Sequence, residues 1–180
     1  MNRVIMNGVR GLSLALLAFA LPASAAAPPA LDAEYAFTAR VTVDPPVIIG
    51  QGAEGLRRYI PITGGEVDGP LLKARILDAS GDWQVVRPDD VIALEARYVL
   101  ETADGVRISV VNRGLRHGPP AVMARMARGE PVAPNEYYFR TAAQFDAPRE
   151  SKYEWLNRSL FVAVAERQAD LVIVHFYRVK

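Results

Sequence analysis

Val91-Ile-Ala-Leu-Glu-Ala-Arg-Tyr-Val-Leu-Glu-Thr102, Ala103-Asp-Gly105 and Val106-Arg-Ile-Ser-Val-Val-Asn-Arg113 follow one another in this chain and decide its fold. The two long pieces alternate apolar and polar residues, a pattern typical of a strand with one buried face. Asp104 and Gly105 between them are residue types that form tight turns. The stretch therefore predicts two antiparallel strands joined by a turn.

Similar runs lie on both sides of this pair. The first, Leu31 to Asp44, ends at two prolines, and a second, Leu56 to Thr63, is followed by Gly64-Gly65, which predicts a hairpin turn. Ser80-Gly-Asp82 predicts another turn. Further runs cover residues 71–77, 83–87, 137–145, 160–165 and 171–179. About nine strands at this spacing are typical of an antiparallel all-β protein.

One segment predicts a helix. Pro119 and Pro120 precede strong helix formers up to Arg128, and Gly129 follows, which is the usual order of start and stop signals. A shorter helical turn is expected around Ser151 to Leu156. Because closure removes exposed sheet edges, we expect a closed antiparallel β-barrel of about 8–9 strands with one main helix. A two-sheet β-sandwich is the alternative.

The first 25 residues have the plan of a secretory signal. Arg3 and Arg10 precede an uncharged run from Gly11 to Leu21, and Ala23-Ser-Ala25 offers a cleavage site. The run is too short to span a bilayer, so a membrane anchor is the weaker interpretation. We expect cleavage of residues 1–25, no stable membrane anchor afterwards, and a single domain over 26–180 located in the periplasm or secreted.

Composition excludes several kinds of function. Half of the chain, 51%, is hydrophobic and there is no cysteine, which excludes disulfide scaffolds and thiol catalysis. The 21 basic and 20 acidic residues leave a net charge of +1, too little for a strong field toward nucleic acid. No nucleic-acid partner is expected.

Motifs for cofactors and metals fail in their context. Gly50-Gln-Gly-Ala-Glu-Gly55 matches the dinucleotide-binding pattern, but a strand rather than a helix is predicted after it. There is no nucleophile-elbow motif around a serine, and the two histidines, His117 and His175, lack a ligand-like spacing. We expect no cofactor and no metal site, and His175 to be a structural residue of its strand.

Arginine beside aromatic residues is the most informative feature for a site. A guanidinium can bind a carboxylate through two hydrogen bonds and stack on a ring, so a lumen lined by both would suit a small aromatic or carboxylate ligand. Strand alternation allows either Arg97 or Tyr98 to face the lumen, not both. Solvated outer faces remain the alternative for each arginine. The candidates are Trp83, Arg87, Arg97, Tyr98, Tyr138, Arg140, Trp155 and Asn157.

A second candidate lies directly before the predicted helix. Arg113, Arg116 and His117 are expected to form an anion-binding corner at the mouth of the barrel, where helix amides also attract negative charge. A surface loop with a hydrogen-bonded histidine is the alternative.

Six motifs, in order, make the chain similar to a known family. Arg58-Tyr-Ile-Pro-Ile-Thr-Gly-Gly65, Asp82-Trp-Gln-Val-Val-Arg-Pro-Asp89, Ala96-Arg-Tyr98, Thr102-Ala-Asp-Gly105, Tyr137-Tyr-Phe-Arg-Thr141 and Tyr153-Glu-Trp-Leu-Asn157 resemble the bacterial family labelled domain of unknown function 3237. The resemblance implies a small lipocalin-like barrel, largely without an assigned activity. This chain has Asp89-Asp90 where the family pattern usually has Asp-Gly, which predicts an altered turn.

Three functions follow from these features. The first is a barrel that binds a small aromatic or carboxylate ligand in its lumen. The second is a cofactor-independent lyase or isomerase in the same cavity, an idea that comes from relatives in aromatic catabolism and from tyrosine and histidine as proton carriers. The third is a structural barrel whose interior is filled by side chains. The partners expected are a small molecule and, as a possibility left open, a second copy of the chain.

Overall fold

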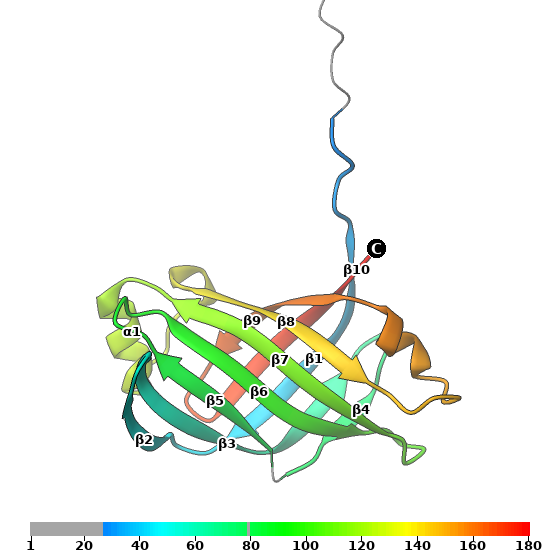
Figure 1. Ribbon diagram of the computed structural model, residues 1–180, viewed down its shortest axis with the longest axis horizontal. Helices are drawn as coiled ribbons and strands as arrows, with labels where there is room; N and C mark the ends of the chain where they lie inside the picture. Colours follow the sequence, from blue (N-terminus) through cyan, green and yellow to red (C-terminus); the bar gives the residue numbers. More distant parts are fainter. Residues whose placement is uncertain (1–26, 79) are drawn as a thin grey trace, which may run out of the picture. The chain divides into compact units, whose positions relative to one another are not determined.

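A single antiparallel sheet of ten strands curves around on itself in the computed structural model, which describes residues 27–78 and 80–180 (Figure 1). The predicted leader, residues 1–25, lies outside the described residues. Residues 31–180 form one compact unit. Its elements are β1 (Ala33–Val43), β2 (Val47–Gly52), β3 (Gly55–Asp68), β4 (Ala74–Ile76), β5 (Ser80–Val86), β6 (Ile92–Glu101), β7 (Arg107–His117), α1 (Pro120–Ala127), η1 (Pro134–Glu136), β8 (Tyr138–Asp146), η2 (Glu154–Arg158), β9 (Phe161–Arg167) and β10 (Leu171–Val179).

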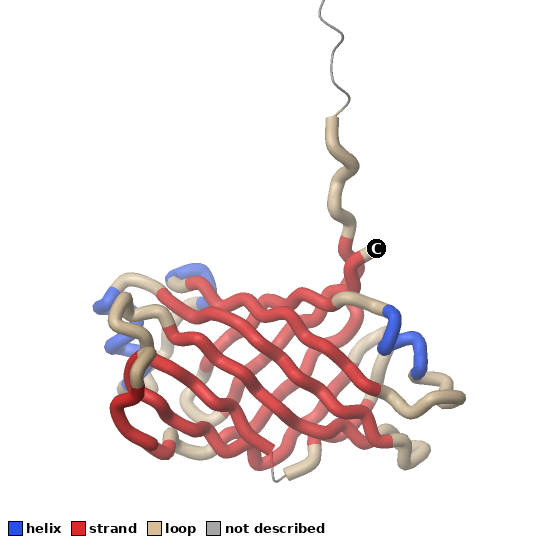
Figure 2. Tube along the Cα trace, viewed as in Figure 1, coloured by secondary structure: helices blue, strands red, loops and turns tan. Residues whose placement is uncertain are grey.

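The sheet closes because β1 pairs with both β10 and β3. Around the barrel the order is β1, β10, β9, β8, β7, β6 and then β3, with β4 and β5 paired between β6 and different halves of β3. The result is a closed eight-stranded antiparallel barrel with two extra strands and one α-helix (Figure 2). The predicted barrel is confirmed, and the sandwich alternative is wrong.

Two predicted turns lie inside strands. Gly64 and Gly65 both have positive φ, yet β3 runs through them to Asp68. The strand bends there, because its first half pairs with β2 and β5 and its second half with β1 and β4. Glycine permits such a bend where a barrel strand turns a corner. Ser80-Gly-Asp82 likewise belongs to β5.

The glycine-rich motif around Gly52 is part of a hairpin. Gly50 and Gly52 lie in β2, a strand that the sequence did not predict, and Gly55 begins β3. No helix opens at these glycines, so this loop does not form the helix N-terminus that a dinucleotide site uses to bind the pyrophosphate.

The helices lie at the two ends of the barrel (Figure 1). Helix α1 matches the predicted segment, and Pro120 stands in its first turn. With η1 it lies at one end, whereas η2, near the predicted short helical turn, lies at the other. In the described part of the chain, no helix is long and apolar enough to cross a membrane.

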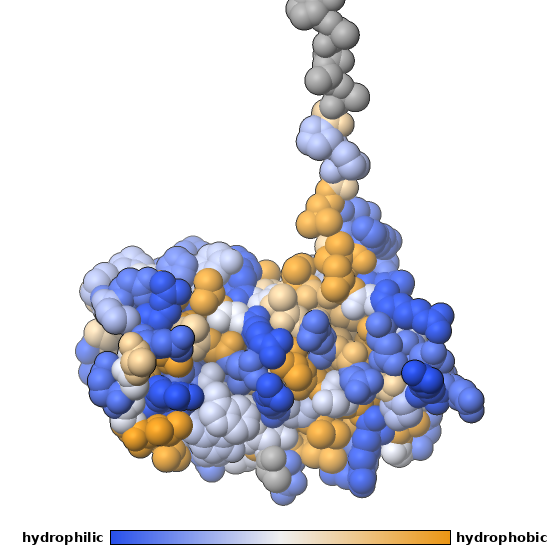
Figure 3. Space-filling view, in the orientation of Figure 1, coloured by the Kyte–Doolittle hydropathy of each residue, from blue (hydrophilic) through white to orange (hydrophobic). Residues whose placement is uncertain are grey.

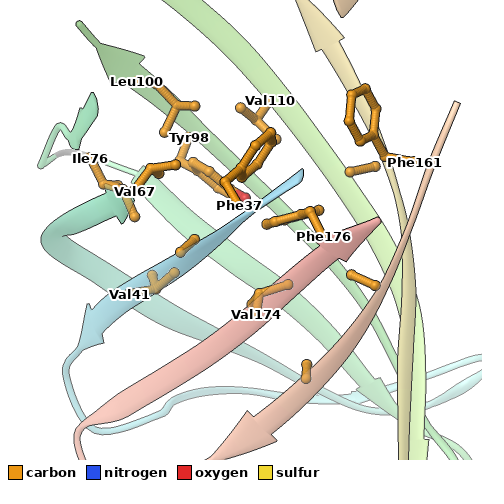
Figure 4. Close-up of a cluster of buried hydrophobic side chains, with 14 of the residues drawn as sticks. Phe37, Val41, Val67, Ile76, Tyr98, Leu100, Val110, Phe161, Val174 and Phe176 are labelled. Atoms are coloured by element: carbon orange, nitrogen blue, oxygen red, sulfur yellow. The ribbon is translucent and has the colours of Figure 1, made fainter. Parts of the chain in front are cut away.

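The core fills the η2 end of the barrel. Phe37, Phe145, Phe161 and Phe176 pack ring against ring, with centroids 4.9–5.9 Å apart. Figure 4 shows Phe37 and Phe176 among aliphatic side chains from neighbouring strands. Aromatic pairs at these separations stabilise a core beyond the burial of their area. At the α1 end the interior is not filled by side chains.

Candidate ligand-binding site in the barrel lumen

A cavity of about 540 Å³ opens inside the barrel at the α1 end. Its volume lies in the range typical of small-molecule sites. Aliphatic walls come from Val41, Ile60, Leu94 and Val174, among others, and Met123 and Met126 of α1 lie at its mouth. The interior is therefore filled only at the phenylalanine end, and the structural reading of a fully filled barrel is wrong.

Polar side chains form a large part of the cavity lining. They are Arg58, Asp82, Gln84, Tyr98, Asn112, Arg116, Thr141 and Arg167, which come from six strands. The antiparallel register explains why they meet: Arg58 is opposite Gln84, Asp82 is opposite Ala96, and Ala96 is opposite Asn112. Small residues between them, such as Ala96 and Gly114, leave space for the longer side chains.

In strand β5 the polar residues face the inside of the barrel, the reverse of the usual pattern. Ser80, Asp82 and Gln84 share the inner face, while Trp83 on the outer face is 46% exposed. In most barrels the inner face would be the apolar one. Of these three, Asp82 and Gln84 line the cavity and form its polar wall on β5.

A hydrogen-bonded chain runs along this wall. Arg58 donates from Nε to Gln84 Oε1 at 2.8 Å, and Gln84 Nε2 donates to Asp82 Oδ2. Four further polar atoms are inaccessible to solvent and have no hydrogen-bond partner: Asp82 Oδ1, Asn112 Oδ1, Arg116 Nε and Thr141 Oγ1. Such atoms are rare in folded proteins because each costs about 1–3 kcal/mol, so four of them in the wall of one cavity make this wall costly to the stability of the fold.

The lumen has an excess of positive charge. Arg58, Arg116 and Arg167 face one carboxylate, Asp82, whereas at the mouth the exposed Arg128 and Asp90 offset each other. Burial lowers the pKa of all three lumen arginines; for Arg116, burial together with the guanidinium groups of Arg58 and Arg167 lowers the pKa to about 10. An anionic ligand would relieve this repulsion.

Asp82 is a strongly perturbed acid. Burial raises its pKa to about 6, although Gln84 and the guanidinium groups of Arg116, Arg58 and Arg167 act in the opposite direction. The residue keeps some contact with the cavity, while its Oδ1 atom is fully covered. A carboxyl group that changes charge near neutral pH, inside a cavity, is typical of a functional site.

Arg116 and Tyr98 are the two predicted residues that line the lumen. Arg116 is 5% exposed, and its guanidinium lies 5.3 Å from the centre of the Phe139 ring. Tyr98 is buried on the lumen side of β6, and desolvation raises the pKa of its phenol. The alternation of side chains along β6 therefore places Tyr98 in the lumen and Arg97 on the outer surface.

Most of the other predicted residues lie on the outside of the barrel. The prediction that they line the lumen is wrong. Side chains alternate between the two faces of a strand, and each of these residues lies on the face opposite to the buried ones. Arg97 and Arg113 both bind Glu95 on the outer surface, and Arg140 lies over the exposed Tyr138 ring. Figure 3 shows hydrophilic and hydrophobic residues mixed over these strands. The lumen candidates that face outward are Trp83, Arg97, Tyr138 and Arg140, and the mouth candidates Arg113 and His117 also face outward.

The predicted anion-binding corner is also wrong as a group. His117 stacks on Tyr138 with ring centroids 4.8 Å apart, and Arg113 faces away from the lumen, so only Arg116 points inward. The alternation of β7 separates Arg116 from both neighbours, since Ile108, Val110, Asn112 and Arg116 share one buried face.

The last four predicted residues have structural contacts. Asn157 receives a hydrogen bond from Ala147 N and donates one to Ala147 O, and Trp155 packs against Phe161 at the η2 end. Arg87 pairs with Asp89 in an exposed turn. His175 bonds to Thr38 at 2.8 Å and faces Glu166, as expected of a structural histidine.

The turn at Asp89-Asp90 keeps a glycine-like conformation. Asp90 has a φ of 62°, in the left-handed region that favours glycine. Asp90 therefore adopts here a conformation that glycine would adopt with less strain.

Comparison with known proteins shows the family and the fold of this chain. The family of proteins of unknown function DUF3237 matches residues 31–179. The chain belongs to the DUF3237 family. A UPF0311 protein of Bradyrhizobium diazoefficiens is 43% identical to this family member over 151 residues, which cover 84% of this chain and 98% of that protein.

A solved structure of a DUF3237 relative has the same barrel. The protein of unknown function from Rhodopseudomonas palustris superposes with a TM-score of 0.82 at 39% identity, over 85% of this chain and all of that one. A more distant relative, a hydroalkoxylation enzyme of Penicillium herquei, is 28% identical over 97 residues, or 54% of this chain and 64% of that protein.

Proposed function

We propose that the barrel lumen binds a small molecule with a flat apolar body and a carboxylate or phenolate group. The observation that carries this proposal is the set of three arginines facing one aspartate inside a cavity whose polar atoms lack partners. The apolar walls would hold the body of the ligand, and the charged wall would hold its anion.

Arg116 is the best placed group to hold the anion. Its side chain lines the cavity, and its guanidinium lies 5.3 Å from the centre of the Phe139 ring. A planar guanidinium presents parallel donors that match the two oxygens of a carboxylate. Arg58 already donates a hydrogen bond from Nε to Gln84, so in the proposed site it assists Arg116 in holding the anion.

We also propose that the leader exports the protein, so that ligand binding takes place outside the cytoplasm. Support comes from the arginines, apolar run and small-residue site of residues 1–25. The ligand would then be a molecule that enters the periplasm or the medium.

Chemistry in the same lumen is the second candidate function. It is favoured by the hydroalkoxylation enzyme of Penicillium herquei, with which this chain shares 97 aligned residues. A cofactor-independent lyase or isomerase would need a proton carrier in the cavity, and the lumen contains one in Asp82.

Calorimetric titration with benzoate tests the binding proposal. The wild-type protein is expected to bind benzoate saturably, and Arg116→Leu to lose about 1.5–3 kcal/mol of binding energy, since a charged hydrogen bond is removed without opening a large cavity. Arg97→Ala is the matched control, because Arg97 binds Glu95 on the outer face. Absence of saturable binding, or equal losses in both variants, would contradict the proposal.

A further inference from the structure

Asp82 is the acid that faces the lumen away from its mouth, since Asp90, the other acid of the cavity lining, is exposed. Asp82 Oδ2 accepts a hydrogen bond from Gln84, whereas Oδ1 is covered and has no partner. Among the described residues, no cationic side chain lies within ion-pair distance of this carboxylate. A buried charged oxygen without a donor is costly, so the geometry favours a carboxyl group that gives up its charge by taking a proton.

Three guanidinium groups line the same cavity, those of Arg58, Arg116 and Arg167. Their positive charge favours the ionised form of Asp82, and Asp82 in turn offsets part of that charge. An anion bound to these arginines would take over the role of Asp82. Two negative charges held close together in a poorly solvated cavity repel each other. The anion and the Asp82 carboxylate therefore compete for the same three cations.

We propose that the lumen takes up a proton on Asp82 when it binds an anion, so that Asp82 is an internal counter-ion that the ligand replaces. The inference rests on the proposed binding of a carboxylate or phenolate ligand in this lumen, and it adds how that binding is regulated. The proton comes from solvent and forms an O–H bond on the carboxylate, while no bond of the ligand changes. Asp82 acts through its charge, so it need not touch the ligand.

The direction of the pH effect follows from the charges. Burial raises the pKa of Asp82 to about 6, so at neutral pH the group is mostly ionised and three guanidinium groups face one carboxylate. As pH falls through about 6, Asp82 loses its charge and the same cations attract an anion more strongly. A bound anion raises the pKa of Asp82 further, because it repels the carboxylate. Binding near neutral pH is therefore coupled to proton uptake.

The other titratable groups around Asp82 keep their charge in this pH range. Its cationic neighbours are Arg58 on β3, Arg116 on β7 and Arg167 on β9, and a pKa of about 10 leaves Arg116 protonated. The phenol of Tyr98 on β6 stays neutral because burial raises its pKa. The remaining neighbours of the arginines are Tyr137 and the exposed groups Asp90, Arg128 and Asp170.

Calorimetric titration with benzoate at pH 5.5 and 7.5 tests the inference, since benzoate is ionised at both values. The wild type is expected to bind roughly 5- to 20-fold more tightly at pH 5.5. Asp82→Asn keeps an oxygen for Gln84 but has no charge. It should bind equally at both pH values and, at pH 7.5, at least ~5-fold more tightly than the wild type. Asp90→Asn, the matched control, removes the acid at the mouth and should keep the pH dependence.

Histidine is the other residue type whose charge ordinarily changes between pH 5.5 and 7.5. His117 and His175 lie on the outer face and remain in Asp82→Asn, so a pH dependence due to histidine would survive in that variant. Benzamide has the shape of benzoate without its charge and should bind more weakly, with an affinity that does not follow pH. An equal pH dependence for benzamide would overturn the inference.

Proton uptake is measured directly by titrating benzoate at pH 7 in buffers of different ionisation enthalpy. We expect roughly half a proton or more to enter the wild type with each benzoate, and none to enter Asp82→Asn. The infrared difference spectrum of the wild type at pH 7 should show the carbonyl band of a protonated carboxyl group when benzoate is added. This band identifies a carboxyl group as the proton acceptor even where the variant fails to fold.

The outcomes separate this inference from the binding proposal. Saturable binding of benzoate with equal affinity at both pH values and no proton uptake would overturn the inference and leave the binding proposal intact. A pH dependence that persists in a folded Asp82→Asn would overturn it as well. Absence of saturable binding by the wild type at either pH would overturn both proposals.

Discussion

Replacing Asp82 by asparagine should stabilise the protein at neutral pH. Asparagine keeps the oxygen that accepts from Gln84 and removes a charge that is unfavourable in this cavity. Natural sites often retain such groups for function at a cost in stability. The variant therefore tests whether the carboxylate is held in a strained, functional environment.

The size of the effect follows from the pKa of Asp82. Its folded value of about 6 lies above the ordinary 3.8, and this difference corresponds to at most ~3 kcal/mol. Below about pH 4 the carboxyl is protonated in both states and the folded protein has its full stability. Between about pH 4 and 6 only the folded state holds the proton, so stability falls as pH rises and this contribution is lost above about 6.

Equilibrium urea unfolding at pH 4 and pH 7.5 measures this difference. We expect Asp82→Asn to raise the free energy of unfolding by about 1–3 kcal/mol at pH 7.5 and by much less at pH 4. Asp89→Asn, in an exposed turn, should change it by less than ~0.5 kcal/mol at either pH. Equal effects of Asp82→Asn at both pH values, or destabilisation at pH 7.5, would refute the reasoning.

Three other predictions concern the backbone and the leader. Asp90→Gly should raise the free energy of unfolding by roughly 0.5–1 kcal/mol, measured by urea denaturation, because φ at Asp90 is 62°. Gly65→Ala should lower it by at least ~2 kcal/mol in the same assay, since a Cβ there would lie 2.0 Å from the Arg40 carbonyl oxygen; a neutral result would contradict the bend in β3. Intact-mass analysis of periplasmic protein should show a chain that begins near Ala26, whereas full-length protein in the inner membrane would contradict the leader.

Alternation predicted the barrel well because it reports directly on burial. Leu94, Tyr98 and Leu100 alternate along β6, and the structure buries all three. The glycine pair in β3 misled the prediction, since the backbone freedom that permits a turn also permits a bend within a strand. Local sequence does not distinguish the two outcomes, which depend on where the partner strands lie.

The charged wall was harder to predict. Charged residues on a strand are usually solvated, so Asp82 and Arg58 gave no local signal of burial. Parity did contain part of the answer: Arg58 shares a face with Ile60 and Ile62, and Arg116 with Ile108.

Arg167 shows the limit of this approach. It lies at the end of β9, and its place in the lumen depends on closure of the barrel, which brings β3, β5, β7 and β9 around one cavity. No spacing within a single strand reveals that juxtaposition.

The most direct test of the lumen as a ligand site is a crystal structure of the protein soaked in benzoate. We predict density for one benzoate inside the barrel, with its carboxylate within hydrogen-bond distance of the Arg116 guanidinium and its ring against the aliphatic wall near Ile60. An empty lumen, or benzoate bound on the outer face beside Trp83, would contradict the account.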